Sequence, residues 1–518
     1  MSAHRTLPLV LALLATLLLA VPSVQAQPDR GTAQTPEQVA KLTASDAARR
    51  DFFGKSVAVD GDTAVIGAVG DDDAGSSSGS AYVFVRSSDG WVEQAKLTAS
   101  DAAHHDLFGN SVAVDGDTAV ISAHSKDGVG SRSGAVYVFV RSGDEWVEQA
   151  KLTASDADES DLFGVSVAVT GDTILIGANG DDDAGEHAGA VYVFVRTDDR
   201  WVEQAKLTAS DAADHDLFGA PAAVDGDTAV FGAHYDDDGG YRSGAVYVFV
   251  RSDGGWVEQA KLTASDAASH DYFGSSVAVT GDTILVGADG DDDAGEDSGS
   301  MYVFVRTGDG WVEQAKLTAS DAAQSDRFGT SVAVDGDNAL IGALGYDSTG
   351  NASTSVYVFV RSDDGWVEQA NLTASDNAPN DLFGTSVALH GGTAVIGAWG
   401  DDDAGDGSGS AYVFSLVVNS PPEATDDTYG LLDVGVSVDP AGIAAPAPGV
   451  LANDNDPDGH PITAQLVTPP DSGTVQLNDD GSFVYTPHAG FTGIDTFVYA
   501  AHDGTATSAP ATVTIRVP

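Results

Sequence analysis

Aspartates are concentrated in short runs whose carboxylates could bind a divalent cation. Five runs of three aspartates occur, and each has a glycine at the first or second position after it. Calcium takes six to eight hard oxygen ligands, and glycine-bearing loops can fold around the ion. Calcium is therefore the candidate cofactor. The candidate ligands are Asp71, Asp73, Asp181, Asp183, Asp291, Asp293, Asp401 and Asp403, and the fifth run is Asp236–Asp238.

The charge, the absence of cysteine and the absence of catalytic motifs exclude several classes of function. The chain has 79 acidic and 23 basic residues, a formal charge of -56 and no cysteine. A field this negative repels phosphate backbones, so nucleic acid is excluded as a partner. The absence of cysteine excludes disulfides and thiol nucleophiles. No serine stands in a Gly-x-Ser-x-Gly motif at a strand-to-helix elbow, and no phosphate loop or nucleotide fingerprint is present. We therefore expect that the protein is not an enzyme.

A repeat of 55 residues positions the aspartates. The pair Phe-Gly recurs at Gly54, Gly109, Gly164, Gly219, Gly274, Gly329 and Gly384. The first copy predicts four strands, at 56–59, 63–68, 81–86 and 91–97, with a tight hairpin at Asp60-Gly61 between the first two. Four short strands per repeat indicate a propeller blade, and the aspartate run falls between the second and third strands.

The two ends of the array predict a closed ring. The fourth-strand signature Lys-Leu-Thr-Ala-Ser-Asp occurs once before the first Phe-Gly, at Lys41, and the last third strand, 411–414, has no fourth strand after it. Pairing these two segments closes the ring and removes the exposed sheet edges. The sequence therefore predicts a seven-bladed β-propeller over 38–418. Open solenoids need atypical capping repeats, and none is visible.

Strand connections alternate between the two faces of a propeller, so a second set of aspartates should share a face with the runs. Asp46 and Asp51, with equivalents such as Asp101 and Asp106, lie between the fourth strand and the next Phe-Gly. The alternative is that these aspartates form turns, cap backbone amides and make a solvated, salt-tolerant surface. The second copy (125–127) and the sixth (346–348) break the aspartate run and should be poor cation sites.

The outer strands begin with tryptophan, five residues after an arginine, as in Arg86 and Trp91. We expect the guanidinium to stack on the indole across the hairpin, a contact of about 0.5–1 kcal/mol. An aromatic platform for a ligand is the alternative.

The repeat resembles the FG-GAP family of seven-bladed propellers, found in integrin α-subunit heads and in exported bacterial proteins. Phe53-Gly54 and Gly67-Ala68 carry the resemblance, and all seven copies show its outline. The chain departs from the family pattern at two points. The proline after Gly-Ala is absent, and the second copy has Ser122 in place of the glycine. The integrin-type calcium loop between the first two strands is reduced to Asp60-Gly61-Asp62, so calcium at that position is not carried over.

The last hundred residues differ from the repeat. A hinge is expected at 419–422 and a β-sandwich over 423–518, which resembles the cadherin-like, immunoglobulin-type domains of bacterial surface proteins. The aspartates at 454, 456 and 458 alternate, so a tight loop could bring them to one ion, although an ordinary Asx turn is the alternative. The resemblance implies calcium ligands at Glu423, Asp427, Asp454, Asp456, Asp458 and Asp503.

The N-terminus is predicted to be a secretory signal peptide over 1–26. His4 and Arg5 precede an apolar stretch that is too short for a comfortable membrane span, and a cleavage pattern of small residues follows it. A linker, 27–37, precedes the propeller. An uncleaved anchor is the alternative. We expect no membrane span after the signal is removed, and we expect a monomer that is secreted or displayed at the cell surface.

Three functions fit these features. The first is recognition or adhesion, with an extracellular protein or glycan as partner and with calcium as a possible requirement. The second is an exported carbohydrate-active enzyme, which predicts a paired acid and base where one blade breaks the sevenfold sameness, and the sixth copy diverges most. The third is an inert structural matrix component.

Overall fold

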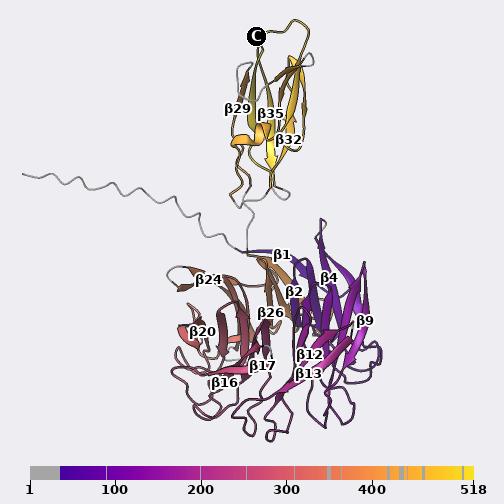
Figure 1. Cartoon of the computed structure of the whole chain (residues 1–518), viewed down its shortest axis with the longest axis vertical. Helices are drawn as coiled ribbons and strands as arrows, with labels where there is room; N and C mark the ends of the chain where they lie inside the picture. Colours follow the sequence, from indigo (N-terminus) through magenta and orange to yellow (C-terminus); the bar gives the residue numbers. More distant parts are fainter. Residues whose placement is uncertain are drawn as a thin grey trace, which may run out of the picture. The chain divides into compact units, whose positions relative to one another are not determined.

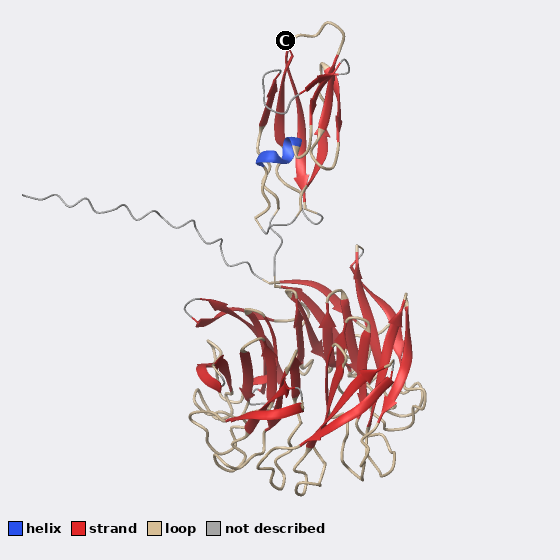
Figure 2. Ribbon diagram, in the orientation of Figure 1, coloured by secondary structure: helices blue, strands red, loops and turns tan. Residues whose placement is uncertain are grey.

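The computed structural model describes residues 36–517 except 89, 199, 253, 309, 347–351, 363–364, 417–420, 431–436, 440–441, 458–460 and 504–506. The predicted signal peptide, most of the predicted linker and two residues of the predicted hinge lie outside the described residues. Within them, nine four-stranded sheets account for the fold, seven in the repeat region and two in the C-terminal region (Figures 1 and 2). The all-β fold class is confirmed.

Seven antiparallel sheets form the blades, and each strand pairs with the next along the chain. Blade 1 comprises β2 (Phe53–Asp60), β3 (Thr63–Ala68), β4 (Ser80–Ser87) and β5 (Gly90–Leu97). Blade 2 comprises β6 (Val112–Asp115), β7 (Thr118–Ala123), β8 (Ala135–Ser142) and β9 (Glu145–Leu152). Blade 3 comprises β10 (Ser166–Thr170), β11 (Thr173–Ala178), β12 (Ala190–Thr197) and β13 (Arg200–Leu207). Blade 4 comprises β14 (Ala222–Asp225), β15 (Thr228–Ala233), β16 (Ala245–Ser252) and β17 (Gly255–Leu262).

Blade 5 comprises β18 (Ser276–Thr280), β19 (Thr283–Ala288), β20 (Ser300–Thr307) and β21 (Gly310–Leu317). Blade 6 comprises β22 (Phe328–Asp335), β23 (Asn338–Tyr346), β24 (Ala352–Ser362) and β25 (Gly365–Leu372). Blade 7 comprises β26 (Phe383–His390), β27 (Thr393–Ala398), β28 (Ser410–Ser415) and the N-terminal strand β1 (Glu37–Leu42).

The ring closes where the sequence predicts. Strand β1 pairs antiparallel with β28, with Gln38 opposite Phe414 and Leu42 opposite Ala411. A side-chain clamp repeats at the same junction. In the other blades a serine of the preceding loop donates to a glutamate of the outer strand, as Ser45 does to Glu93 at 2.8 Å. At the closure Gln38 takes the glutamate's place and accepts from the Ser375 amide at 2.9 Å.

Hydrophobic cores form between neighbouring blades. Val65 and Val83 of blade 1 pack with Ile121 and Tyr137 of blade 2, and all four are fully buried. The two glycines of the family pattern permit this close approach. A Cβ on Gly67 would lie 2.0 Å from the carbonyl oxygen of Gly109 in the next blade, so no other residue fits without a shift. At the exceptional position, the Ser122 hydroxyl instead accepts a hydrogen bond from the Ser111 amide at 3.0 Å.

The C-terminal region is a sandwich of two sheets. One sheet has the order β29 (Asp427–Gly430), β36 (Ala511–Val517), β35 (Gly493–His502) and β32 (Thr463–Thr468). The other has the order β30 (Ser437–Asp439), β31 (Gly442–Ala445), β34 (Phe483–Pro487) and β33 (Gly473–Leu477). A 3-10 turn, η1 (Gly449–Asn453), is the only helical element among the described residues. Phe483, Tyr485, Phe497 and Tyr499 form the core with the apolar residues of β36.

Candidate functional site

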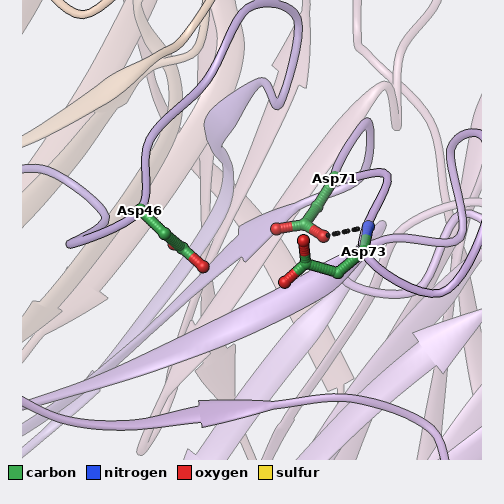
Figure 3. Close-up of side chains that lie close together, drawn as sticks. All are labelled: Asp46, Asp71 and Asp73. Carbon is green, nitrogen blue, oxygen red and sulfur yellow. Dashed lines mark hydrogen bonds between the residues drawn. The ribbon is translucent and has the colours of Figure 1, made fainter.

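The two sets of aspartates meet on one face of the propeller, as predicted. Asp46 comes from the loop after β1, and Asp71 and Asp73 come from the loop after β3 (Figure 3). One carboxylate oxygen from each lies within 4.8 Å of the others, and the Asp73 amide donates to the Asp71 carboxylate at 3.0 Å. Such a triad could hold an ion. Equivalent triads are Asp266, Asp291 and Asp293, and Asp376, Asp401 and Asp403.

A lysine ammonium lies among the carboxylates of the triad. Lys96 Nζ, from the outer strand β5, is 2.7 Å from Asp46, 2.8 Å from Asp71 and 2.6 Å from Asp73. Burial would lower the pKa of Lys96, but hydrogen bonds to the three aspartates outweigh it and raise that pKa. Asp71 is only 4% exposed, so the ammonium neutralises a carboxylate that has little access to water. Five blades share the arrangement, through Lys41, Lys96, Lys206, Lys261 and Lys316.

Sequence reasoning missed these lysines because it followed only the acidic residues. A signal was present in the copies themselves. The sixth copy has lost both the lysine, which is Asn371, and the aspartate run. In the second copy Lys126 replaces the buried aspartate, and its Nζ lies 2.8 Å from the Asp106 carboxylate. The losses and replacements occur together because the groups contact one another. A divalent cation would have to displace an ammonium from any of the five complete triads.

The aspartate beside each Phe-Gly has a structural role, as the capping alternative predicts. Asp51 is 6% exposed and accepts the Ala48 amide at 2.6 Å. Its neighbours Arg50 and Phe52 both have positive φ, at 68° and 56°. The buried carboxylate therefore holds a tight turn that leads into the first strand of the blade.

The tryptophans are also structural. Arg86 is opposite Trp91 in the β4–β5 pairing, with the guanidinium carbon 5.9 Å from the ring centroid. Arg196 lies 4.8 Å from the Trp201 ring, and the Trp201 indole N–H donates to Gln149 of the neighbouring blade at 3.1 Å. The predicted cation–π contact is confirmed, and the indole N–H of Trp146, Trp201 and Trp311 donates to a glutamine of the adjacent blade.

One position varies from blade to blade on the same face as the triads. We call it the variable ring: the residue that follows the Gly-Ala or Ser-Ala pair at the end of each second strand. Its members are Val69, His124, Asn179, His234, Asp289, Leu344 and Trp399. Each is partly or largely buried, and no described residue gives a partner to His124 Nδ1, Asn179 Oδ1, His234 Nδ1 or Trp399 Nε1. Burial lowers the pKa of His124 and of His234 to about 4, so both imidazoles are neutral at neutral pH.

Lys55 stands beside this ring. Its Nζ lies 4.9 Å from the Trp399 ring centroid, and its charge helps to lower the pKa of His124. The chain has eight lysines, and the other seven contact aspartates. No carboxylate in the described part of the chain pairs with Lys55, and burial lowers its pKa. An unpaired, half-buried cation in so acidic a protein is a suitable partner for an anionic group.

In the sandwich, two of the six predicted ligands come together. The Tyr499 hydroxyl lies 2.8 Å from one Asp454 oxygen and 3.3 Å from an Asp427 oxygen. Burial, and then the charge of Asp454, raises the pKa of Asp427 to about 7. Burial also raises the pKa of Asp454. The pair thus carries like charges with too little counter-charge, a setting that favours a cation.

Three other predicted ligands of the sandwich lie among the described residues. Glu423 is exposed, and its amide donates to the Asn455 carbonyl at 2.8 Å. Asp456 is 7% exposed, and Asp503 follows the end of β35. Asp458 lies outside the described residues. Of the six predicted ligands, the structure joins Asp427 and Asp454 through the Tyr499 hydroxyl, and calcium binding by the set stays a prediction.

The seven four-stranded sheets and their closure by β1 define the chain's larger part as a seven-bladed β-propeller. The FG-GAP repeat model matches residues 36–84, 91–139, 146–194, 201–249, 256–304, 311–359 and 366–414, which is more than half of the chain. The protein therefore belongs to the FG-GAP repeat family. The model of the bacterial cadherin-like domain matches residues 419–518. Comparison with curated proteins returned no match. No helix in the described ranges has the length and apolar character needed to cross a membrane.

Proposed function

We propose that this is a surface recognition protein whose propeller binds an extracellular glycan or protein through the face that carries the variable ring. The observation that carries the proposal is where the seven copies differ. Residues that pack between blades recur almost unchanged, as with Tyr82, Tyr137 and Tyr192. The seven positions of the variable ring, in contrast, hold six different residue types, and only histidine occurs twice. Packing alone favours the same residue in every blade, so this diversity supports a role in binding.

The chemistry of the ring supports a partner that has hydrogen-bonding groups and a negative charge. His124, Asn179 and His234 offer neutral polar groups, and Lys55 offers an unpaired ammonium. A carboxylated glycan or an acidic peptide segment supplies both kinds of group. The bacterial cadherin-like match further supports a place at the cell surface, with the sandwich as a spacer.

A binding assay with purified full chain tests the proposal. We expect Lys55→Ala and Trp399→Ala to weaken binding to acidic glycans or to extracellular matrix proteins at least tenfold. Arg200→Ala is the matched control, because Arg200 is an exposed cation at the start of β13, where the β12–β13 hairpin lies on the opposite face. Equal loss in all three variants, or no loss in Lys55→Ala and Trp399→Ala, would contradict recognition by this face.

We further propose that calcium binds to the sandwich and not to the five lysine-filled triads. The Asp427–Asp454 pair lacks a neighbouring ammonium among the described residues, whereas each complete triad has one. Calorimetric titration of the full chain with calcium should give heat that Asp454→Asn abolishes. Heat that survives in this variant would place the calcium elsewhere.

The second candidate function is a carbohydrate-active enzyme, and we propose that the protein does not have this activity. The sixth copy was the expected place for a paired acid and base. Asp321 and Asp326 do line one pocket there, but the Tyr357 hydroxyl binds the first, and the Ala323 amide binds the second in a backbone turn. Both carboxylates thus accept hydrogen bonds that recur as structural contacts in the other blades, which favours a structural role over acid–base catalysis.

A further inference from the structure

Blade 6 keeps one of the three carboxylates that contact the lysine in blade 1, Asp321 in place of Asp46, but it has no lysine. In blade 1, Lys96 is opposite Tyr82 in the β4–β5 pairing, and its Nζ lies 5.4 Å from the tyrosine ring centroid. In blade 6 the residue opposite Tyr357 is Asn371, which is too short and carries no charge. Tyr357 still donates to Asp321 at 2.7 Å, as Tyr82 donates to Asp46 at 2.7 Å.

The connection after the second strand has also changed. In blade 1, β3 ends at Ala68 and the aspartate loop follows, which brings Asp71 close to Asp51. In blade 6, β23 and β24 continue as a longer ladder, with Tyr346 opposite Ala352. Asp326 is consequently only half-buried, whereas its six counterparts are 3–6% exposed.

A pocket of about 240 Å³ occupies this place. Asp321, Asp326, Ser355 and Tyr357 supply its polar lining. Several water molecules, at about 30 Å³ each, or one four-carbon amine would fit in such a volume.

We propose that the blade 6 pocket binds a primary alkylammonium group, as carried by a lysine side chain or a free amine. Five other blades hold an ammonium against the equivalent aspartate and tyrosine, with Nζ 5.1–5.4 Å from the ring centroid. Blade 6 keeps this tyrosine and this aspartate as Tyr357 and Asp321, and both line the pocket, so an ammonium there would meet the same ring and one of the carboxylates that the lysines contact. Calcium is a poorer fit, because it needs six to eight oxygen ligands and gains nothing from the aromatic ring.

Ligand-observed NMR with the full chain at about 0.15 M salt tests this inference, since screening at that ionic strength removes diffuse attraction to the acidic surface. The probe is N-acetyl-lysine methylamide, and N-acetyl-norleucine methylamide is its neutral match. We expect saturable binding of the lysine probe in the millimolar range and at least tenfold weaker binding of the norleucine probe.

Two variants locate the binding. Asn371→Lys should abolish it by supplying the missing ammonium, and should also raise the melting temperature. Asn371→Met should fill the pocket without the charge and also abolish binding, which separates occupancy from electrostatics. Two results would overturn the proposal. One is amine binding that is undiminished in both variants. The other is that the amine does not bind at all, while calcium binds and Asn371→Lys removes that calcium binding.

Further probes separate the possible sources of the ammonium. Butylamine that binds as well as the lysine probe indicates a free amine, whereas a preference for the lysine probe indicates a protein side chain. The outcome is independent of the variable ring, because Lys55→Ala should leave amine binding unchanged.

Discussion

At the scale of single residues, the lysine of the outer strand determines whether the aspartates of five blades can bind a cation. Lys96 bridges one buried and two exposed carboxylates, and the same bridge recurs around the ring. Exposed ion pairs contribute little to the free energy of unfolding, but a buried carboxylate that loses its positively charged partner destabilises the fold strongly. The lysine is therefore a fixed internal counter-ion, and cation specificity in this face depends on whether it is present.

Replacing Lys96 with methionine should test this role. We expect a loss of about 2–3 kcal/mol in stability, because Asp71 remains buried without its ammonium. We also expect a new calcium site, visible as a melting temperature that recovers when calcium is added. Lys151→Met is the control. Lys151 pairs only with the exposed Asp101, so its loss should cost less than about 1 kcal/mol.

The acidic pair of the sandwich predicts a dependence on pH. The pKa of Asp427 is raised to about 7, so the folded state binds the proton more tightly than the unfolded state does. Its contribution to stability is therefore greatest below about pH 4 and is lost as pH rises to about 7. Asp427→Asn should stabilise the sandwich by about 1–2 kcal/mol at pH 8, after allowance for solvent screening, and should have little effect at pH 4.

Hydrogen exchange in β35 and β36 measures this effect separately from the propeller. Calcium should stabilise the wild-type sandwich at pH 8 and leave the asparagine variant unchanged. A variant that is less stable than the wild type at pH 8 would contradict the like-charge interpretation.

At the scale of elements, the blades depend on glycines at points where two backbones meet. Gly67→Ala should destabilise the propeller by more than about 3 kcal/mol, because the new Cβ would lie 2.0 Å from a carbonyl oxygen of the next blade. Gly61→Ala is the control. Its Cβ would meet nothing within 4 Å, and its cost of about 1 kcal/mol comes only from the positive φ of 54°. Similar melting temperatures for the two variants would contradict the steric account.

The sequence predicts the elements well where their pattern is regular. The second strand is found at the predicted residues, Thr63–Ala68, and the other three strands of blade 1 extend beyond their predictions by one to three residues at an end. The lysine contacts could not be predicted in this way. A bulge between Val83 and Phe84 sets the pairing of β4 with β5, and therefore places Lys96 opposite Tyr82. Such a bulge leaves no mark in the alternation of apolar residues. The proximity of Asp427 and Asp454 was implied only by family resemblance, because the two residues lie on different segments of the sandwich.

At the scale of the whole molecule, the propeller depends on one non-local pairing. Strand β1 is about 370 residues from β28 along the chain, and it supplies the outer edge of blade 7. Deleting residues 36–43 should expose the edge of β28 and remove the Gln38–Ser375 clamp. We expect a lower melting temperature and concentration-dependent association, measured by sedimentation, because an uncovered strand edge pairs with other chains. Gln38→Ala is the milder comparison, and it should lower the melting temperature without causing association.

Because β1 and β28 close the ring, the propeller could be circularly permuted. Glu37 is opposite Ser415 at the closure, the position that Val92 and Val85 occupy near the β4–β5 hairpin of blade 1. A short linker could therefore join β28 to β1, and new chain termini could be placed at any of the equivalent hairpins. Such a circular permutation would leave every blade unchanged. Numbering along the polypeptide is then arbitrary for a binding partner, which meets only a circular succession of side chains with no first or last member.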